Sequence, residues 1–484
     1  MADSLSNFMD SFGDQNRAFG VRVDALDSIR MFATRESIEK LMAFLGHCGV
    51  KFLNIGSIFA GCGGKQISSF AVDNNFLTPA IFKENFPAGE AANFAVQFFH
   101  GQKTQEFRAE FAKFCDAQAH WLNGYSLFCA LAKQIGSYDF STWPEILRMC
   151  SRKTAEIVKR QLESEVLLHK IMQFFARKQL ALLRDLANGC GIFLCGDCDI
   201  LCENFSADVW DNQGLFFVND LGKATVFTGL PPSETCKKGL KTTKVPYRIG
   251  HMKNSNYEFL DRMFFAWQNM FDAVFLLNGH GIFQYWEIPC DESDPKHGRW
   301  VNLPADAFFG HMDSHFNNFP YLFDFNEPLF PQNEIISKRH SMLQVAIDGE
   351  PASHSNEVYD LRRDIFAIAS RSCDRKTGRV STFPGAVAAQ TRSCLDNFKA
   401  ENYKLCILDF EEICSTAKSK WGSVVSDPRG RGEAFASFAE HYRCTGGYAA
   451  ATLPKGGDSA ASADAGKASL AQKTAKFFKD ILNR

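Results

Sequence analysis

The sequence lacks an excess of charge of either sign, because 53 lysine and arginine residues stand against 55 aspartate and glutamate residues. A protein that binds nucleic acid or anionic lipid needs a strongly positive face. Long hydrophobic runs are also missing, since no stretch approaches the roughly 18 apolar residues that span a bilayer. Residues 1–16 are polar and acidic, unlike an export signal. We therefore expect no nucleic-acid partner, no membrane contact and a cytoplasmic location.

Phosphate-binding motifs are absent as well, since the chain contains neither GxxxxGK[ST] nor a strand followed by GxGxxG. The 16 cysteines are scattered through expected helices and strands, which favours reduced thiols over a disulfide framework. Cys195 and Cys198 form a CxxC pair, but they lie across the end of an expected strand, so their side chains need not converge on zinc. The sequence therefore predicts no cofactor and no metal.

Short β-rich apolar runs alternate with helical patterns along most of the chain. In the first helical pattern, Ile38, Leu41, Met42 and Leu45 repeat at i, i+3, i+4 and i+7, and Gly46 should end the helix. The expected strands are residues 21–23, 52–58, 192–195, 273–277, 321–325, 365–369 and 405–410. This alternation predicts an α/β fold with parallel strands, a (β/α)8 barrel of the TIM type.

Composition divides the chain into four parts. Residues 1–19 form an N-terminal arm, and residues 20–452 form the barrel, with a helical insertion at about 82–188 between early strands. Residues 453–467 are rich in Gly, Ala, Ser and Asp, which is typical of a flexible linker. Residues 468–484 predict a short amphipathic helix. We expect this helix to bind a protein partner through its apolar face, which includes Leu470, Phe477, Phe478 and Ile481.

An ordered series of motifs carries the strongest signal. The motifs are Trp121-Leu122 with Tyr125 and Leu127-Phe128, Trp143-Pro144, Gly196-Asp197, SADVW at 206–210, GLPP at 229–232, YWEIP at 285–289 and GRWV at 298–301. In this order and spacing the chain resembles the 4-alpha-glucanotransferases, or amylomaltases, of glycoside hydrolase family 77. The resemblance runs from about residue 20 to about residue 302, and more weakly to about 377. It implies the same barrel fold.

The resemblance also implies a retaining mechanism, in which one carboxylate attacks the sugar and a second carboxyl group protonates the leaving oxygen, ~5 to 5.5 Å away. In the family motif RIDHFRGF…YWEVP, the D is the nucleophile. Counting back from Tyr285-Trp286 without a gap places this D at Leu277, the R at Phe275 and the H at Asn278. Leucine cannot form the glycosyl ester that the mechanism requires. We therefore predict that the attacking group is missing.

Other functional residues of the family have weaker counterparts. By the resemblance, Asp324 falls about where the family has its acid/base Glu, and Asp374 corresponds best to its transition-state-stabilising Asp. Asp197, Asp208 and Trp210 lie in retained motifs and are the candidate substrate-binding residues. Two of them have structural alternatives: Asp197 could cap the loop after its strand, and Trp210 could belong to the core.

The sugar-binding loop is altered. The family segment GQxWGNPxY aligns with residues 239–247, where Thr242 replaces the Trp and Lys244 replaces the Asn. The family motif PPD aligns with residues 231–233, where Ser233 replaces the acidic residue. The family segment SPY aligns with Cys62-Gly63-Gly64, which supplies no tyrosine. Because sugars bind through aromatic stacking and paired polar contacts, these changes argue against an enzyme that is merely slow.

We interpret the chain as a glucanotransferase-family pseudoenzyme that acts as a structural or binding protein. Two alternatives stay open. The first is an active 4-alpha-glucanotransferase acting on maltooligosaccharides, starch or glycogen, and the second is a non-catalytic sensor that binds α-glucan weakly. A fold does not fix an activity, so the residues of the site have to distinguish between these three functions.

Overall fold

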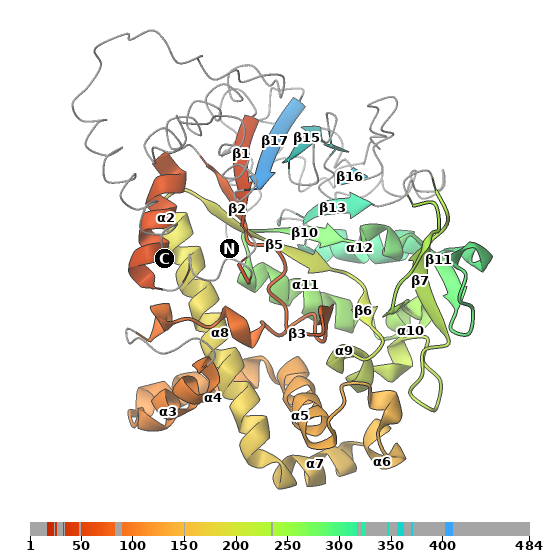
Figure 1. Cartoon of the computed structure of the whole chain (residues 1–484), viewed down its shortest axis with the longest axis horizontal. Helices are drawn as coiled ribbons and strands as arrows, with labels where there is room; N and C mark the ends of the chain where they lie inside the picture. The colour runs from red at the N-terminus through yellow and green to blue at the C-terminus, as the bar shows by residue number, and fades with distance from the viewer. Residues whose placement is uncertain are drawn as a thin grey trace.

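The structure, a computed structural model, describes most of the first two thirds of the chain and four later strands (Figure 1). The described residues are 17–23, 25–26, 32, 34–47, 50–82, 90–149, 151–233, 236–316, 319, 321–325, 346–347, 356–362, 369–370 and 402–409. The expected linker at 453–467, the expected helix at 468–484 and Asp374 lie outside the described residues.

A mostly parallel sheet forms the centre of the described part. Its strands, in spatial order, are β14 (Ala346–Ile347), β15 (Asn356–Arg362), β17 (Asn402–Asp409), β1 (Arg17–Arg22), β2 (Phe52–Asn54), β5 (Phe193–Asp199), β10 (Ala273–Leu277), β13 (Tyr321–Phe325) and β16 (Ala369–Ser370). The strands from β17 to β16 all pair in parallel, whereas β15 runs antiparallel to β17 and to β14. The expected α/β fold is confirmed. The end strands β14 and β16 lie in contact, and closure into a barrel stays a prediction.

Pairing moves several strand ends away from where the sequence pattern puts them. β1 begins at Arg17 rather than at residue 21, because its first residues pair with β17 from Lys404 onward. Residues 17–19 therefore belong to the sheet and not to the arm. β2 ends at Asn54, since Gly56 adopts a φ of 69° that leaves the extended conformation. β5 continues to Asp199, because it pairs with β10 to its last residue.

The expected helical insertion between early strands is confirmed, and it lies between β2 and β5. Its helices are α3 (Ala91–Gly101), α4 (Gln105–Ala117), α5 (Ala119–Ile135), α6 (Glu145–Arg148), α7 (Arg152–Gln161) and α8 (Glu163–Gly189). Figure 1 shows the long helix α8 running from beside the sheet down into the group formed by α3 to α7. The same connection contains the small hairpin of β3 (Gly61–Cys62) and β4 (Lys65–Gln66).

The other α-helices in the described part of the chain are α2 (Arg35–His47), α9 (Ala207–Asp211), α10 (Ile249–Asn254), α11 (Glu258–Met270) and α12 (Ala305–Phe316). The prediction that Gly46 ends the first helix is wrong, because α2 continues to His47. A Cβ at Gly46 would lie 3.3 Å from the backbone oxygen of Cys190. The glycine therefore lets α2 approach the turn that follows α8.

A second, antiparallel sheet holds the YWEIP and GRWV motifs. Its strands, in spatial order, are β12 (Arg299–Asn302), β11 (Gln284–Pro289), β7 (Val226–Leu230) and β8 (Leu240–Lys241). Next to it, β9 (Lys244–Val245) pairs with β6 (Cys202–Glu203), which follows β5. This pairing brings the segment 239–247 toward the carboxyl end of β5.

The two faces of the main sheet differ because side chains alternate along each strand. Leu194, Val274 and Leu276 belong to the main hydrophobic core, and helices α8 and α11 contact β5 and β10. Gly196 shares this face, where a Cβ would lie 2.3 Å from the Phe271 ring. The opposite face of the same two strands carries the alternate residues, including Asp197, Asp199, Phe275 and Leu277.

Asp272 is a buried charged residue at the amino end of β10, next to this core. Its carboxylate accepts hydrogen bonds from the Arg184 Nε of α8 at 2.7 Å and from the Leu194 amide at 2.8 Å. The Asp272 amide in turn donates to the Leu194 carbonyl at 2.8 Å. Asp272 therefore holds α8, β5 and β10 together, at the end of the strand opposite to Leu277.

The close contact at Gly196 leads to a stability prediction. Gly196→Ala should lower the free energy of unfolding by about 1 to 3 kcal/mol, because the added methyl group would collide with the fully buried Phe271 ring. Thermal unfolding followed by circular dichroism measures the effect. Gly101→Ala, where a Cβ meets nothing within 4 Å, is the matched control and should not destabilise the protein. Equal effects of the two substitutions would contradict the packing.

Candidate functional site

The carboxyl edge of the main sheet is where parallel α/β proteins place their active sites. Here β10 ends at Leu277, whose Cα partner on β5 is Asp199. On the other side of β10, Leu276 pairs with Phe323 of β13, so Asp324 follows one residue beyond the last ladder pair. The register therefore brings the backbones of Leu277, Asp199 and Asp324 to the same edge.

The position expected to carry the nucleophile holds no acidic group. β10 is described completely, and its five residues Ala273–Leu277 are all apolar. Phe275, at the expected arginine position, is 5% exposed, and Leu277 is partly buried. Asp272 lies at the amino end of the strand in its bonds to Arg184 and Leu194. Within β10, therefore, no side chain can attack a sugar.

For Asp324, the acid/base candidate, the strand pairing shows its place in the sheet. Asp324 lies in β13 and pairs with Ala369 of β16. Its neighbourhood to β10 is the arrangement that the resemblance implies for an acid/base residue, and that role stays a prediction. Asp374 lies outside the described residues, so its expected role also stays a prediction.

Asp197 of β5 is bound by side chains of β2, the adjacent strand, and of β1, the next strand in the sheet. Its carboxylate accepts hydrogen bonds from Arg22 Nη2 of β1 at 2.6 Å and from Asn54 Nδ2 of β2 at 2.9 Å. The Asn54 Oδ1 accepts from the Gly56 amide at 2.8 Å. Because Asp197 is only 3% exposed, these bonds supply the partners that a buried carboxylate needs. They tie β1, β2 and β5 together.

Asp208 is buried in α9 and contacts the segment after the β3–β4 hairpin. Its carboxylate accepts hydrogen bonds from the Ser68 hydroxyl at 3.0 Å and from the Ser69 amide at 2.5 Å. Burial raises the pKa of Asp208 to about 7, although these hydrogen bonds act in the opposite direction. The contacts join α9 to the chain around Ser68.

Trp210 lies in the layer of helices, where it contacts two other aromatic rings. Its side chain packs on Phe128 and Trp143, with ring centroids 5.7 and 5.9 Å away. Its Nε1 donates to the Leu147 carbonyl at 3.1 Å, and the residue is 6% exposed. A tryptophan that stacks on a sugar must expose a ring face, so these contacts favour the core alternative.

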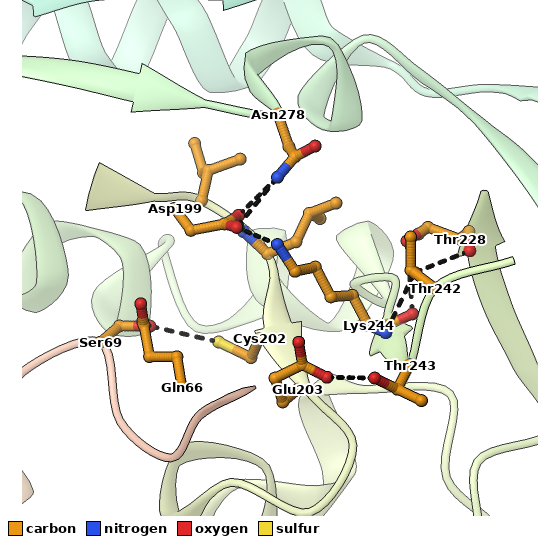
Figure 2. Close-up of polar contacts among 12 residues, drawn as sticks. Gln66, Ser69, Asp199, Cys202, Glu203, Thr228, Thr242, Thr243, Lys244 and Asn278 are labelled. Atoms are coloured by element: carbon orange, nitrogen blue, oxygen red, sulfur yellow. Dashed lines mark hydrogen bonds and ion pairs between the residues drawn. The ribbon is translucent and has the colours of Figure 1, made fainter. Parts of the chain in front are cut away.

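A polar cluster that sequence reasoning missed lies beside Leu277. Lys244 of β9 forms an ion pair with the Asp199 carboxylate. Asn278 Nδ2 donates to both Asp199 oxygens, at 3.0 and 2.9 Å, and the Leu201 amide donates to Oδ1 at 2.9 Å. Figure 2 shows the Lys244 and Asn278 side chains directed at the Asp199 carboxylate.

All three side chains of this cluster are departures from the family motifs. The family motif that begins at Gly196-Asp197 reads GDLPI, and by the resemblance Asp199 stands at its Pro position. By the same resemblance Lys244 stands at the Asn position of GQxWGNPxY and Asn278 at the His position of RIDHFRGF. An acid, a base and an amide that appear together in motif positions are chemically complementary. That coincidence is the signal that could have revealed the cluster from the sequence.

The segment 239–247 makes further internal contacts, some of them visible in Figure 2. The hydroxyls of Thr242 and Thr228 lie 2.9 Å apart, and Thr243 Oγ1 donates to Glu203 Oε2 at 2.5 Å. The Tyr247 hydroxyl donates to the Ile200 carbonyl. Together with Lys244, these residues bond the second half of the segment to other parts of the chain.

Other ligands find little support in the described part of the chain. Among its residues no group of three His, Cys, Asp or Glu side chains is placed to hold a metal ion. Cys195 and Cys198 are buried, and burial raises the pKa of both thiols, which disfavours the thiolate that binds zinc. None of the described helices is both long and apolar enough to cross a membrane.

The parallel sheet and the helical insertion define an α/β protein, and the family motifs lie along and around the carboxyl edge of that sheet. A sequence model of the 4-alpha-glucanotransferase family matches residues 83–330, and the chain belongs to this family. The confirmed resemblance therefore covers both the insertion and the strands β5, β10 and β13.

Individual relatives agree with this assignment. The 4-alpha-glucanotransferase of Thermus thermophilus is 29% identical over 259 residues, which are 52% of this chain and 52% of that protein. The Aquifex aeolicus 4-alpha-glucanotransferase is 26% identical over 305 residues, 58% of this chain and 63% of that protein. The chain thus spans about half to two thirds of the length of these relatives.

A solved structure shows the same fold. The amylomaltase from Streptococcus agalactiae, determined in complex with acarbose, superposes with a TM-score of 0.59 at 18% identity. The match covers 66% of this chain and 71% of that one. At this identity the likeness speaks for the fold and leaves the chemistry to the residues of the site.

The raised pKa of Asp208 leads to a prediction on pH. With a pKa of about 7 in the folded protein against 3.8 ordinarily, Asp208 keeps a proton that the unfolded chain releases. Its contribution to stability is full below about pH 4 and is lost as the pH rises to about 7. Asp208→Asn should therefore reduce the dependence of the unfolding midpoint temperature on pH between pH 4 and 7, measured by thermal denaturation. An unchanged pH profile would show that Asp208 is already ionised across this range.

Proposed function

We propose that this protein is a non-catalytic member of the 4-alpha-glucanotransferase family that acts as a structural or binding protein. The observation that carries the proposal is the apolar β10, in which Leu277 stands at the expected nucleophile position. A covalent nucleophile cannot be replaced by positioning alone, and its removal typically costs several orders of magnitude in rate.

The residue paired with Leu277 on β5 is Asp199, and the environment of its carboxylate does not suit a nucleophile. It is engaged by Lys244, Asn278 and the Leu201 amide. A nucleophile needs a lone pair directed at the anomeric carbon, whereas these donors take up the carboxylate's acceptor sites. This geometry supports lost catalysis over rearranged catalysis.

A glucan-binding sensor is the second candidate, favoured by the retained Asp197, Asp208 and Trp210. Their contacts weaken it, because Asp197 is bound by Arg22 and Asn54, and Trp210 is packed in the helical layer. An active glucanotransferase is the third candidate, since relatives bear that name. For the location we propose the cytoplasm, on the basis of the balanced charge and the reduced thiols.

The first test is a transfer assay. Purified protein incubated with maltotriose should release no glucose at a rate of about 1 per second or faster, the scale of ordinary enzymes. The Thermus thermophilus enzyme serves as the positive control. Leu277→Asp should also stay inactive, because Phe275 and Thr242 still differ from the family motifs. Enzymatic turnover by the unmodified protein would refute the proposal and restore the active alternative.

The second test concerns residues 468–484, the segment expected to bind a protein partner. We propose that a protein partner binds Leu470, Phe477, Phe478 and Ile481, because an apolar stripe this short orders only when it docks on a surface. Deleting residues 468–484 should leave the melting temperature nearly unchanged and abolish co-purification of the main cellular partner. A large fall in melting temperature with the partner retained would instead assign the tail to this chain's own core.

A further inference from the structure

The cluster around Asp199 joins three segments that are distant in the sequence. Lys244 lies 45 residues from Asp199, and Asn278 lies 79 residues from it. Lys244 belongs to the segment 239–247, Asn278 to the turn after β10, and Asp199 to the end of β5. The three side chains therefore meet directly beside Leu277, at the edge where the family resemblance places the sugar.

The acceptor capacity of Asp199 is used internally. A carboxylate offers about four lone-pair sites. Here the Leu201 amide and Asn278 bond to Oδ1, and Asn278 and Lys244 bond to Oδ2. A sugar hydroxyl that approached this carboxylate would have to displace one of the chain's own donors.

Partial burial makes the pair interdependent. The side chains of Asp199 and Lys244 are 12% and 20% exposed. Removing one member of such a pair leaves a poorly solvated charge without its partner, which is strongly unfavourable. Asp199 and Lys244 thus each depend on the other, which fits their joint departure from the family motifs.

The turn after β10 is held in an unusual conformation as part of the same arrangement. Asn278 has a φ of 56°, in the left-handed region that asparagine tolerates better than most residues. From this backbone position its amide reaches both oxygens of Asp199. The cluster thereby connects the carboxyl end of β10 to the segment 239–247.

From these contacts we infer that Asp199, Lys244 and Asn278 form an internal lock, which holds the segment 239–247 on the carboxyl edge and excludes α-glucan from the former sugar site. The inference rests on the proposed loss of catalysis and extends it to binding. It favours a structural protein over a glucan sensor.

Hydrogen exchange tests whether the lock holds the segment. Asp199→Ala and Lys244→Ala should each speed amide exchange in residues 239–247 by roughly tenfold or more, because local opening then costs less. The charge swap Asp199→Lys with Lys244→Asp should recover part of the protection, as expected for a direct pair. Lys238→Ala, at an exposed lysine next to the segment, is the matched control and should change nothing. Unchanged exchange in both alanine variants would overturn the lock.

Calorimetry with maltoheptaose tests whether the lock excludes glucan. The unmodified protein should show no binding up to about 10 mM, a limit that corresponds to very weak affinity. The double variant Asp199→Asn with Lys244→Asn removes both charges together and leaves neither unpaired. It should bind maltoheptaose with a dissociation constant of about 1 mM or lower, at least about tenfold below the limit set for the unmodified protein.

The outcomes separate the two proposals. Binding of maltoheptaose by the unmodified protein without turnover would overturn the lock and leave the loss of catalysis standing. Turnover by the unmodified protein would refute the proposed function itself. A double variant whose segment 239–247 exchanges fast but which takes up no maltoheptaose would show that the lock is not the barrier to glucan.

Discussion

The parallel pairing of β5 with β10 is the interaction on which the site depends. Its ladder runs from Ala273 opposite Cys195 to Leu277 opposite Asp199. Asp272 stabilises the amino end of this pair through Arg184 and the Leu194 amide. A shift of one residue would exchange the two faces of a strand. In β5 the face with Asp197 and Asp199 would then meet the helices, so the burial of Leu194 and the close fit of Gly196 against Phe271 keep Asp199 beside Leu277.

Once this register is set, the polar groups at the carboxyl edge find partners within the chain. Asp197 is bound by Arg22 and Asn54, and Asp199 by Lys244 and Asn278. Buried polar groups without partners are costly, so the loss of substrate contacts that we propose requires these groups to be satisfied internally. This requirement explains why the departures from the family motifs are chemically matched to one another rather than scattered.

The motifs that agree with the family have structural tasks in this chain. In SADVW, the Ser206 hydroxyl accepts from the Val209 amide and caps α9, while Asp208 joins α9 to Ser68 and Ser69. Trp210 fills the layer between α5 and α9. Agreement with the family over residues 83–330 is therefore evidence for a shared framework. It does not by itself carry the chemistry of the relatives, because the framework and the attacking group are different residues.

The sequence by itself determined the elements whose signal is local. The apolar runs that became β10 and β13 and the helical periodicity that became α2 to α8 follow from neighbouring residues. The prediction that Leu277 stands at the nucleophile position also needed only a count of residues back from the YWEIP motif. The tertiary structure alone decided which polar groups meet, since Arg22 and Asp197 are 175 residues apart and Lys244 and Asp199 are 45 apart. Such pairs depend on strand order and register between distant segments, and no local periodicity encodes them.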